Sequence, residues 1–80
     1  MTREAIAAKT LELLSKRGAD SSICPSEVVR QLSPQSWREW MPLVREVAAE
    51  LMAEGKLRVT QGDQEVHPLT VKGAIRLRLP

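Results

Sequence analysis

The 80-residue chain has no phenylalanine, no tyrosine and no asparagine, and it has only one cysteine and one histidine. A single cysteine excludes an intrachain disulfide, and one histidine with one cysteine is too small a set for a zinc site. No run of about 18 apolar residues is present, so no membrane-spanning helix is expected. The first ten residues do not have the pattern of a signal peptide. We therefore expect a cytoplasmic protein with no cofactor, no bound metal and no membrane contact.

The length of the chain predicts one small domain that covers residues 1–80. A chain of this size buries about 60% of its surface on folding, which is enough for a single core. The large apolar residues available for that core are ten leucines, seven valines, three isoleucines, three methionines and two tryptophans.

Two helices are predicted in the amino-terminal part of the chain. The first covers residues 2–17, with Thr2 as its N-cap and Gly18 as its stop. After a short extended stretch at residues 22–24, Pro25 begins a second helix, because its fixed φ suits the first helical position. Pro34 restricts the residue before it, so the second helix ends near Leu32.

The third predicted helix is the longest and ends at Glu54. It begins either at the pair Ser33-Pro34 or at Ser36, and Pro42 lies within it. The apolar residues keep one helical phase on both sides of the proline, which predicts one kinked helix or two segments nearly in line. The same phase places the two tryptophans in the core, so we expect Trp→Ala changes there to cost several kcal/mol.

The period of the apolar residues changes to two after residue 55. Leu57 and Val59 alternate with polar residues, and Ile75 and Leu77 do the same near the carboxyl end, as is typical of half-buried antiparallel strands. The segment 61–73 between them would be a long wing. This order of elements predicts an α+β, mainly helical fold, namely a winged helix-turn-helix with three helices and a small antiparallel β-sheet.

Five sequence blocks in this order resemble the bacterial domain-of-unknown-function 3253 family. The blocks are Ser22-Ile23-Cys24-Pro25-Ser26-Glu27-Val28, Trp37-Arg38 with Met41-Pro42 and Val44-Arg45, Val59-Thr60-Gln61-Gly62, Lys72-Gly73, and Ile75-Arg76-Leu77-Arg78. The resemblance covers about residues 4–79. It implies a small winged-helix-like bacterial protein, but it implies no activity and supplies no binding residues, because the family has no assigned function.

The positive charge of the chain is concentrated near its carboxyl end. Residues 55–80 have five basic and two acidic side chains, although the net charge of the whole chain is only +2. The strand pattern places Lys56, Arg58, Arg76 and Arg78 on one outer face, and Lys72 lies in the wing. Such a face suits phosphate contacts, although it also suits a solvated strand edge or pairing with nearby glutamates.

Two further arginines, Arg38 and Arg45, lie on one flank of the long helix and are candidates for entering a nucleic-acid groove. Ion pairing combined with packing of their stems over the core suits them slightly better. The other flank is acidic, and asparagine, which reads adenine by a bidentate contact, is absent. Sequence-specific readout is therefore not expected, and weak contact with a DNA or RNA backbone is our leading hypothesis.

The alternative hypothesis is a protein-interaction module, with itself or another protein as the partner. Its contact surface would be the acidic flank of the long helix with Leu43, which we expect to be exposed. An enzyme is not expected, because Cys24 has no base near it in the sequence and no glycine-rich phosphate loop is present. His67, in a polar loop, is expected to be simply exposed.

Overall fold

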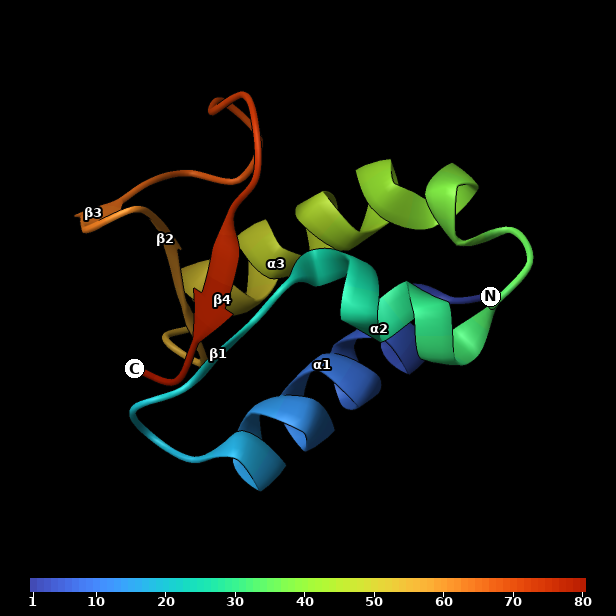
Figure 1. The fold of residues 1–80 in the computed structure, drawn as a ribbon, viewed down its shortest axis with the longest axis horizontal. Helices are drawn as coiled ribbons and strands as arrows, with labels where there is room; N and C mark the ends of the chain where they lie inside the picture. The colour runs from blue at the N-terminus through green and yellow to red at the C-terminus, as the bar shows by residue number, and fades with distance from the viewer.

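Three α-helices occupy one part of the molecule and four short strands form a small sheet in the other (Figure 1). The computed structural model describes residues 1–80. The elements in chain order are α1 (Arg3–Arg17), β1 (Ser22–Ile23), α2 (Pro25–Leu32), the 3-10 helix η1 (Trp37–Trp40), α3 (Met41–Ala53), β2 (Arg58–Gln61), β3 (Gln64–Glu65) and β4 (Arg76–Arg78). This arrangement is consistent with a winged-helix-like α+β fold, as the sequence predicts.

The ends of α1 and α2 are set by local hydrogen bonds. The Thr2 hydroxyl accepts a bond from the Ala5 amide at 3.1 Å, and the Gly18 amide donates to the Leu14 carbonyl at the other end of α1. At the start of α2, the Glu27 carboxylate accepts a bond from the Cys24 amide at 3.0 Å. The predicted starts of both helices are confirmed. None of the helices has both the length and the hydrophobicity needed to span a bilayer.

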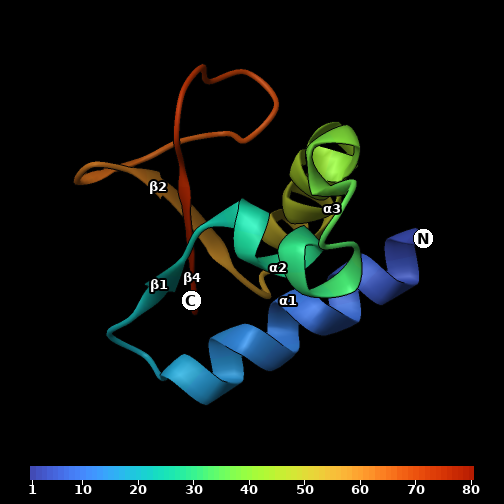
Figure 2. The same cartoon turned by 45° about the vertical axis from the view of Figure 1, so that its right-hand side comes forward.

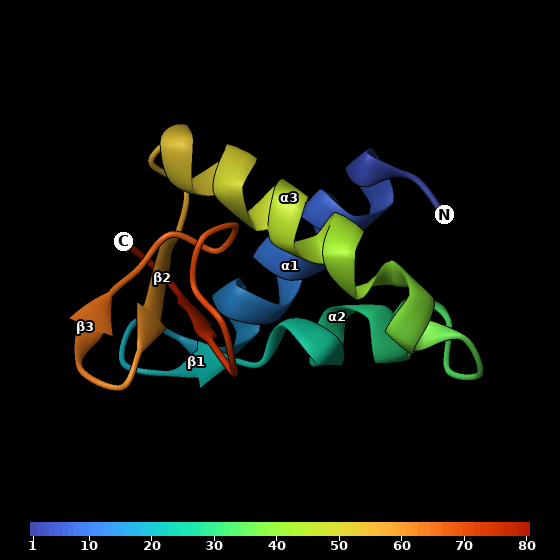
Figure 3. The ribbon, with the colours of Figure 1, turned by 90° about the horizontal axis from the view of Figure 1, so that it is seen from above.

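The connection from α2 to α3 decides between the two predicted starts of the third helix. The start at Ser33-Pro34 is wrong, because residues 33–36 form a turn and η1 begins only after Ser36. Pro42 lies in the first turn of α3, where its missing amide leaves no carbonyl unsatisfied. Figure 3 shows η1 running directly into α3, which confirms the interpretation of two consecutive segments.

The sheet has the strand order β1-β4-β2-β3, and every neighbouring pair is antiparallel. Leu77 in the central strand β4 lies opposite Val59 of β2 and Ile23 of β1. The β2–β3 hairpin turns at Gly62, whose φ of 62° is accessible to glycine without steric cost. The loop 66–75 then leads back to β4 and curves toward α3 (Figure 2).

One cluster of fourteen buried apolar residues joins the helices to the inner face of the sheet. Its largest fully buried members are aliphatic, and they are Ile6, Leu14, Ile23, Ile75 and Leu77. The prediction that Trp37 and Trp40 lie in the core is wrong, because both are half-buried at its edge. Leu43, expected to be exposed, is also half-buried. The tryptophans precede α3, where the helical segment extends beyond the sheet and beyond the centre of the core.

Candidate nucleic-acid interface

Three arginines gather on the outer face of the sheet. Arg58 of β2 lies directly opposite Arg78 of β4, and Arg76 lies opposite Thr60. Directly paired residues of antiparallel strands point to the same face, so the three arginine side chains lie on one face of the sheet. The buried residues Val59 and Leu77 point to the other face. We refer to Arg58, Arg76 and Arg78 as the sheet-face arginines.

The sheet-face arginines are held by neutral acceptors. Arg76 donates from Nε to the Ser22 hydroxyl at 2.9 Å and from Nη2 to the Ser22 carbonyl at 3.1 Å. Arg78 donates from Nε to the Thr60 hydroxyl at 3.1 Å. Arg58 donates from Nε to the Leu79 carbonyl at 3.3 Å. These bonds orient the guanidinium groups without neutralising them.

No carboxylate lies within ion-pair distance of any sheet-face arginine, although five other basic residues of the chain are paired. The Nη atoms of Arg58 and Arg78 make no hydrogen bond to the protein, so they are free to bind a ligand. A polar hollow of about 290 Å³ lies beside them and is lined by Arg58, Thr60, Gly62, Asp63 and Arg78.

Two carboxylates of the β2–β3 hairpin lie near this face. Asp63 lines the hollow, and Glu65 shares the outer face because it is paired with Thr60. Neither forms an ion pair. They reduce the positive potential of the face at its hairpin edge, which limits the strength of any anion binding there.

Lys56, which was predicted on this face, lies elsewhere, whereas Lys72 lies in the long loop where the sequence places it. Lys56 precedes β2 rather than lying in it, and its ammonium group pairs with Glu54 at 3.3 Å. Lys72 is exposed in the loop 66–75 and has no carboxylate partner. The structure therefore brings together three residues of the predicted strand-face group and separates Lys56 from them.

The half-buried Arg45 side chain forms hydrogen bonds within the protein. Its Nη1 donates to the carbonyl oxygens of Pro68 and Val71 at 3.0 and 3.1 Å, and its Nη2 donates to the carbonyl oxygen of Gly73. The guanidinium group thus holds the loop 66–75 against α3. The flank of α3 that was predicted to face a nucleic-acid groove is covered at this point by the loop.

Arg38 lies over the Trp37 ring, with its guanidinium carbon 4.5 Å from the ring centroid. Arg30, from the end of α2, lies over the same ring at 4.2 Å. We refer to Arg30, Trp37 and Arg38 as the corner cluster. Sequence reasoning missed Arg30, because no periodicity or spacing indicates that the end of α2 meets η1 at this ring.

The exposed side of α3 is acidic and is partly neutralised by α1. The Arg3 guanidinium bonds Glu46 at 2.7 Å and Glu50 at 2.9 Å. The hydrogen bond that Arg3 donates to Glu46, followed by the charge of Glu50, raises the pKa of Arg3 above its ordinary value. This side of α3 therefore carries no positive charge of its own with which to attract phosphate.

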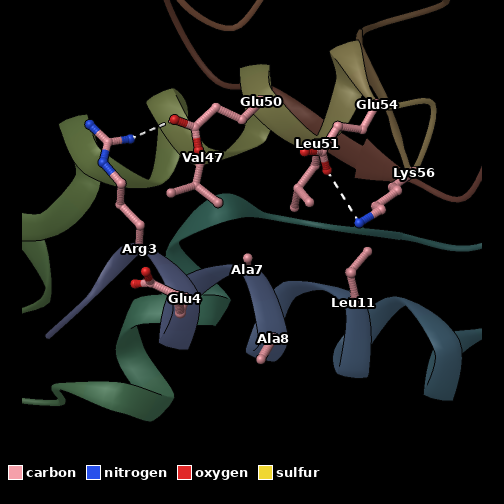
Figure 4. A pocket seen from close by; sticks show the side chains of 10 residues that line it. All are labelled: Arg3, Glu4, Ala7, Ala8, Leu11, Val47, Glu50, Leu51, Glu54 and Lys56. Atoms are coloured by element: carbon pink, nitrogen blue, oxygen red, sulfur yellow. Dashed lines mark hydrogen bonds and ion pairs between the residues drawn. The ribbon is translucent and has the colours of Figure 1, made fainter.

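A groove lies between α1 and α3, and it is shown in Figure 4. It encloses about 300 Å³, and its apolar lining consists of Ala7, Ala8, Leu11, Val47 and Leu51. One ion pair, between Arg3 and Glu50, joins α1 to α3 at one end of the groove, and a second, between Glu54 and Lys56, lies at the other end, just after α3. We refer to this surface as the α1–α3 groove.

Cys24 and His67, the side chains with potential reactivity, contact groups close to them in the sequence. The Cys24 thiol lies 3.2 Å from the Ser26 hydroxyl, and the His67 Nδ1 accepts a hydrogen bond from the Leu69 amide. No group of three His, Cys, Asp or Glu side chains is arranged to hold a metal ion.

Comparison with known families shows which family the chain matches. The model of the family described as "Protein of unknown function (DUF3253)" matches residues 3–80. No curated protein matches the chain.

Proposed function

The chain belongs to the DUF3253 family, which has no assigned function, and we propose from its geometry that it is a weak, non-specific nucleic-acid-binding module. The sheet-face arginines would contact the phosphate backbone. The observation that carries this proposal is the gathering of Arg58, Arg76 and Arg78 on one exposed face with no carboxylate within ion-pair distance.

The chemistry of the guanidinium group supports a phosphate ligand. A planar guanidinium presents its N–H groups in a fork that matches two phosphate oxygens. In Arg58 and Arg78, bonding through Nε fixes the plane and leaves the two Nη atoms for the ligand. Three like charges on one face also repel one another, and a polyanion relieves that repulsion while releasing its own counterions.

The same geometry argues against sequence-specific readout. The hydroxyl groups nearest the arginines, those of Ser22 and Thr60, already accept hydrogen bonds from them. The chain has no asparagine, and the exposed side of α3 carries Glu46 and Glu50, which would repel phosphates flanking a groove. Backbone contact without base readout is therefore the mode that the charges favour.

A fluorescence-anisotropy titration with labelled duplex and single-stranded oligonucleotides at low salt tests this proposal. The variant carrying Arg58→Gln and Arg78→Gln should bind about tenfold more weakly than the native chain, since a loss of about 1.4 kcal/mol is tenfold. The control Lys16→Gln removes one charge from α1, where Lys16 faces Glu12, and should bind like the native chain. Circular dichroism checks that each variant is folded. Absence of binding by the native chain would refute the proposal.

The alternative function is a protein-interaction module, and the apolar lining of the α1–α3 groove favours it. A second copy of the chain is the partner to test first, by sedimentation velocity over a range of concentrations. Ala8 is exposed and lines the groove, so Ala8→Glu should abolish any self-association, whereas a monomer at every concentration excludes a homodimer. Both functions are binding roles without catalysis, and the location we propose for both is the cytoplasm, as expected from the sequence.

A further inference from the structure

We infer that the corner cluster is a second phosphate-binding site for the nucleic-acid backbone. The inference rests on the proposed function and extends it, because the corner cluster lies at the opposite end of the molecule from the sheet (Figures 1 and 3). The site consists of Arg30 from α2 and Trp37 and Arg38 from η1. Arg30 is not among the residues that the sequence predicts to contact nucleic acid.

The first argument is the concentration of charge at one ring. The guanidinium carbons of Arg30 and Arg38 lie 4.2 and 4.5 Å from the centroid of the Trp37 ring. The electron-rich face of an indole attracts a cation, but it carries no net charge and does not neutralise one. No carboxylate lies within ion-pair distance of either arginine. Two exposed positive charges are therefore held together without a counterion from the protein.

The second argument is the orientation that stacking imposes. A guanidinium that lies over an aromatic ring keeps its N–H donors at its edge, where they can reach an anion. Neither Arg30 nor Arg38 donates a hydrogen bond to another group of the protein. All of their donors are therefore available to a phosphate.

The third argument is the space beside the ring. A hollow of about 190 Å³ is lined by Gln35, Ser36, Trp37, Arg38 and Glu39. The Ser36 hydroxyl and the Gln35 amide supply neutral donors for phosphate oxygens. Glu39 also lines the hollow and opposes an anion, so the site suits a single backbone phosphate better than a multiply charged small anion.

These observations assign Trp37 a positioning role rather than a base-stacking role. Aromatic side chains of single-strand binders present a free ring face to a base. Here two guanidinium groups already lie over the ring. The molecule extends 31 Å along its longest axis, and phosphates of one DNA strand lie about 3.4 Å apart along the helix. An oligonucleotide of roughly ten or more residues is therefore long enough to reach from the sheet-face arginines to the corner cluster.

The fluorescence of Trp37 provides a direct test. The chain has two tryptophans and no tyrosine, so Trp40→Phe leaves Trp37 as the only strong emitter. We expect a single-stranded oligonucleotide of about 12 nucleotides, within the usual range of site sizes, to change the Trp37 emission. The change should saturate at the concentration at which anisotropy shows binding. If Trp40→Phe does not fold, the native protein serves the same purpose, because both of its tryptophans lie in η1.

Arginine variants locate the response. Arg30→Gln and Arg38→Gln should each weaken binding by about threefold to tenfold, which corresponds to the loss of one phosphate contact, and should reduce the change in emission. The control Lys16→Gln also removes one positive charge, but at the far end of α1. It should alter neither the affinity nor the change in emission. Arg58→Gln should weaken binding while leaving the emission change at saturation intact.

Three results would overturn the inference. The first is that anisotropy shows binding, the Trp37 emission does not change, and both arginine variants bind with native affinity. This result refutes the corner site and leaves the proposed function standing. Absence of binding in both measurements refutes the proposed function and the corner site together. A complete emission change caused by inorganic phosphate but not by the oligonucleotide would identify a small-anion site and refute the assignment to nucleic acid.

Discussion

Replacing Arg45 by alanine should release the loop 66–75 from α3. The guanidinium donates to three carbonyl oxygens that come from one short stretch of chain, those of Pro68, Val71 and Gly73. No other side chain of α3 donates a hydrogen bond to this loop. From the other side, Gln61 donates to the carbonyl oxygens of Lys72 and Ala74, so the loop is held by two side chains.

The size of the effect follows from these bonds. A hydrogen bond that involves a charged group contributes about 1.5–3 kcal/mol when it is shielded from water. Two of the three Arg45 bonds are partly buried and one is exposed, so we expect Arg45→Ala to cost about 3 kcal/mol. A domain of this length has a total stability of roughly 4–12 kcal/mol. Arg45→Lys keeps the charge but loses the planar fork, and should cost about half as much.

Urea denaturation followed by circular dichroism measures this loss, and limited proteolysis locates it. The midpoint should fall in the order native, Arg45→Lys, Arg45→Ala, with an unchanged slope, and early cleavage should map to residues 66–75. A native midpoint together with native protease resistance in Arg45→Ala would refute the role of this side chain. Full rescue by lysine would show that charge, and not the three-carbonyl geometry, is what matters.

Three further predictions follow from the core, a turn and one ion pair. Leu77→Ala should lower the free energy of unfolding by about 2–5 kcal/mol, because the side chain is fully buried, and a loss below about 1 kcal/mol would contradict its central place. Gly62→Ala should cost about 1 kcal/mol in the same assay, because the backbone at this turn has a positive φ; equal stability would contradict this. The hydrogen bond from Lys9 lowers the pKa of Glu12. The pair therefore stabilises the folded state at neutral pH, and this stabilisation is lost as the pH falls below the ordinary glutamate pKa of about 4.3. The change in the denaturation midpoint between neutral and acid pH should therefore be smaller in Glu12→Gln than in the native chain. An equal change in both proteins would contradict the lowered pKa of Glu12.

The ends of α1 and the start of α2 were predictable because they depend on neighbouring residues. The Thr2 hydroxyl caps the amide of Ala5, three residues later, and Gly18 terminates α1 with a φ of 88°. Pro25 fixes the start of α2 in the same local way. The strand alternation likewise predicted that Arg58, Arg76 and Arg78 share a face, since the period of a strand is two.

The surroundings of the tryptophans and of Arg45 were not predictable, because they depend on distant parts of the chain. Helical phase shows which side of a helix faces inward, but it does not show how far along its axis the core extends. Trp37 and Trp40 have the inward phase and still lie beyond the centre of the core. The carbonyl partners of Arg45 are 23 to 28 residues away in a loop with no regular pattern.

The salt dependence of oligonucleotide binding tests the central claim most directly. If the three sheet-face arginines each neutralise one phosphate, they should together contribute about −2.7 to the slope of the logarithm of the duplex binding constant against the logarithm of salt concentration, and phosphate contacts at the corner cluster should make the total slope steeper. Each Arg→Gln change at position 58, 76 or 78 should make that slope shallower by about 0.9. A slope near zero, or one that the three substitutions leave unchanged, would show that this face of the sheet does not bind a polyanion.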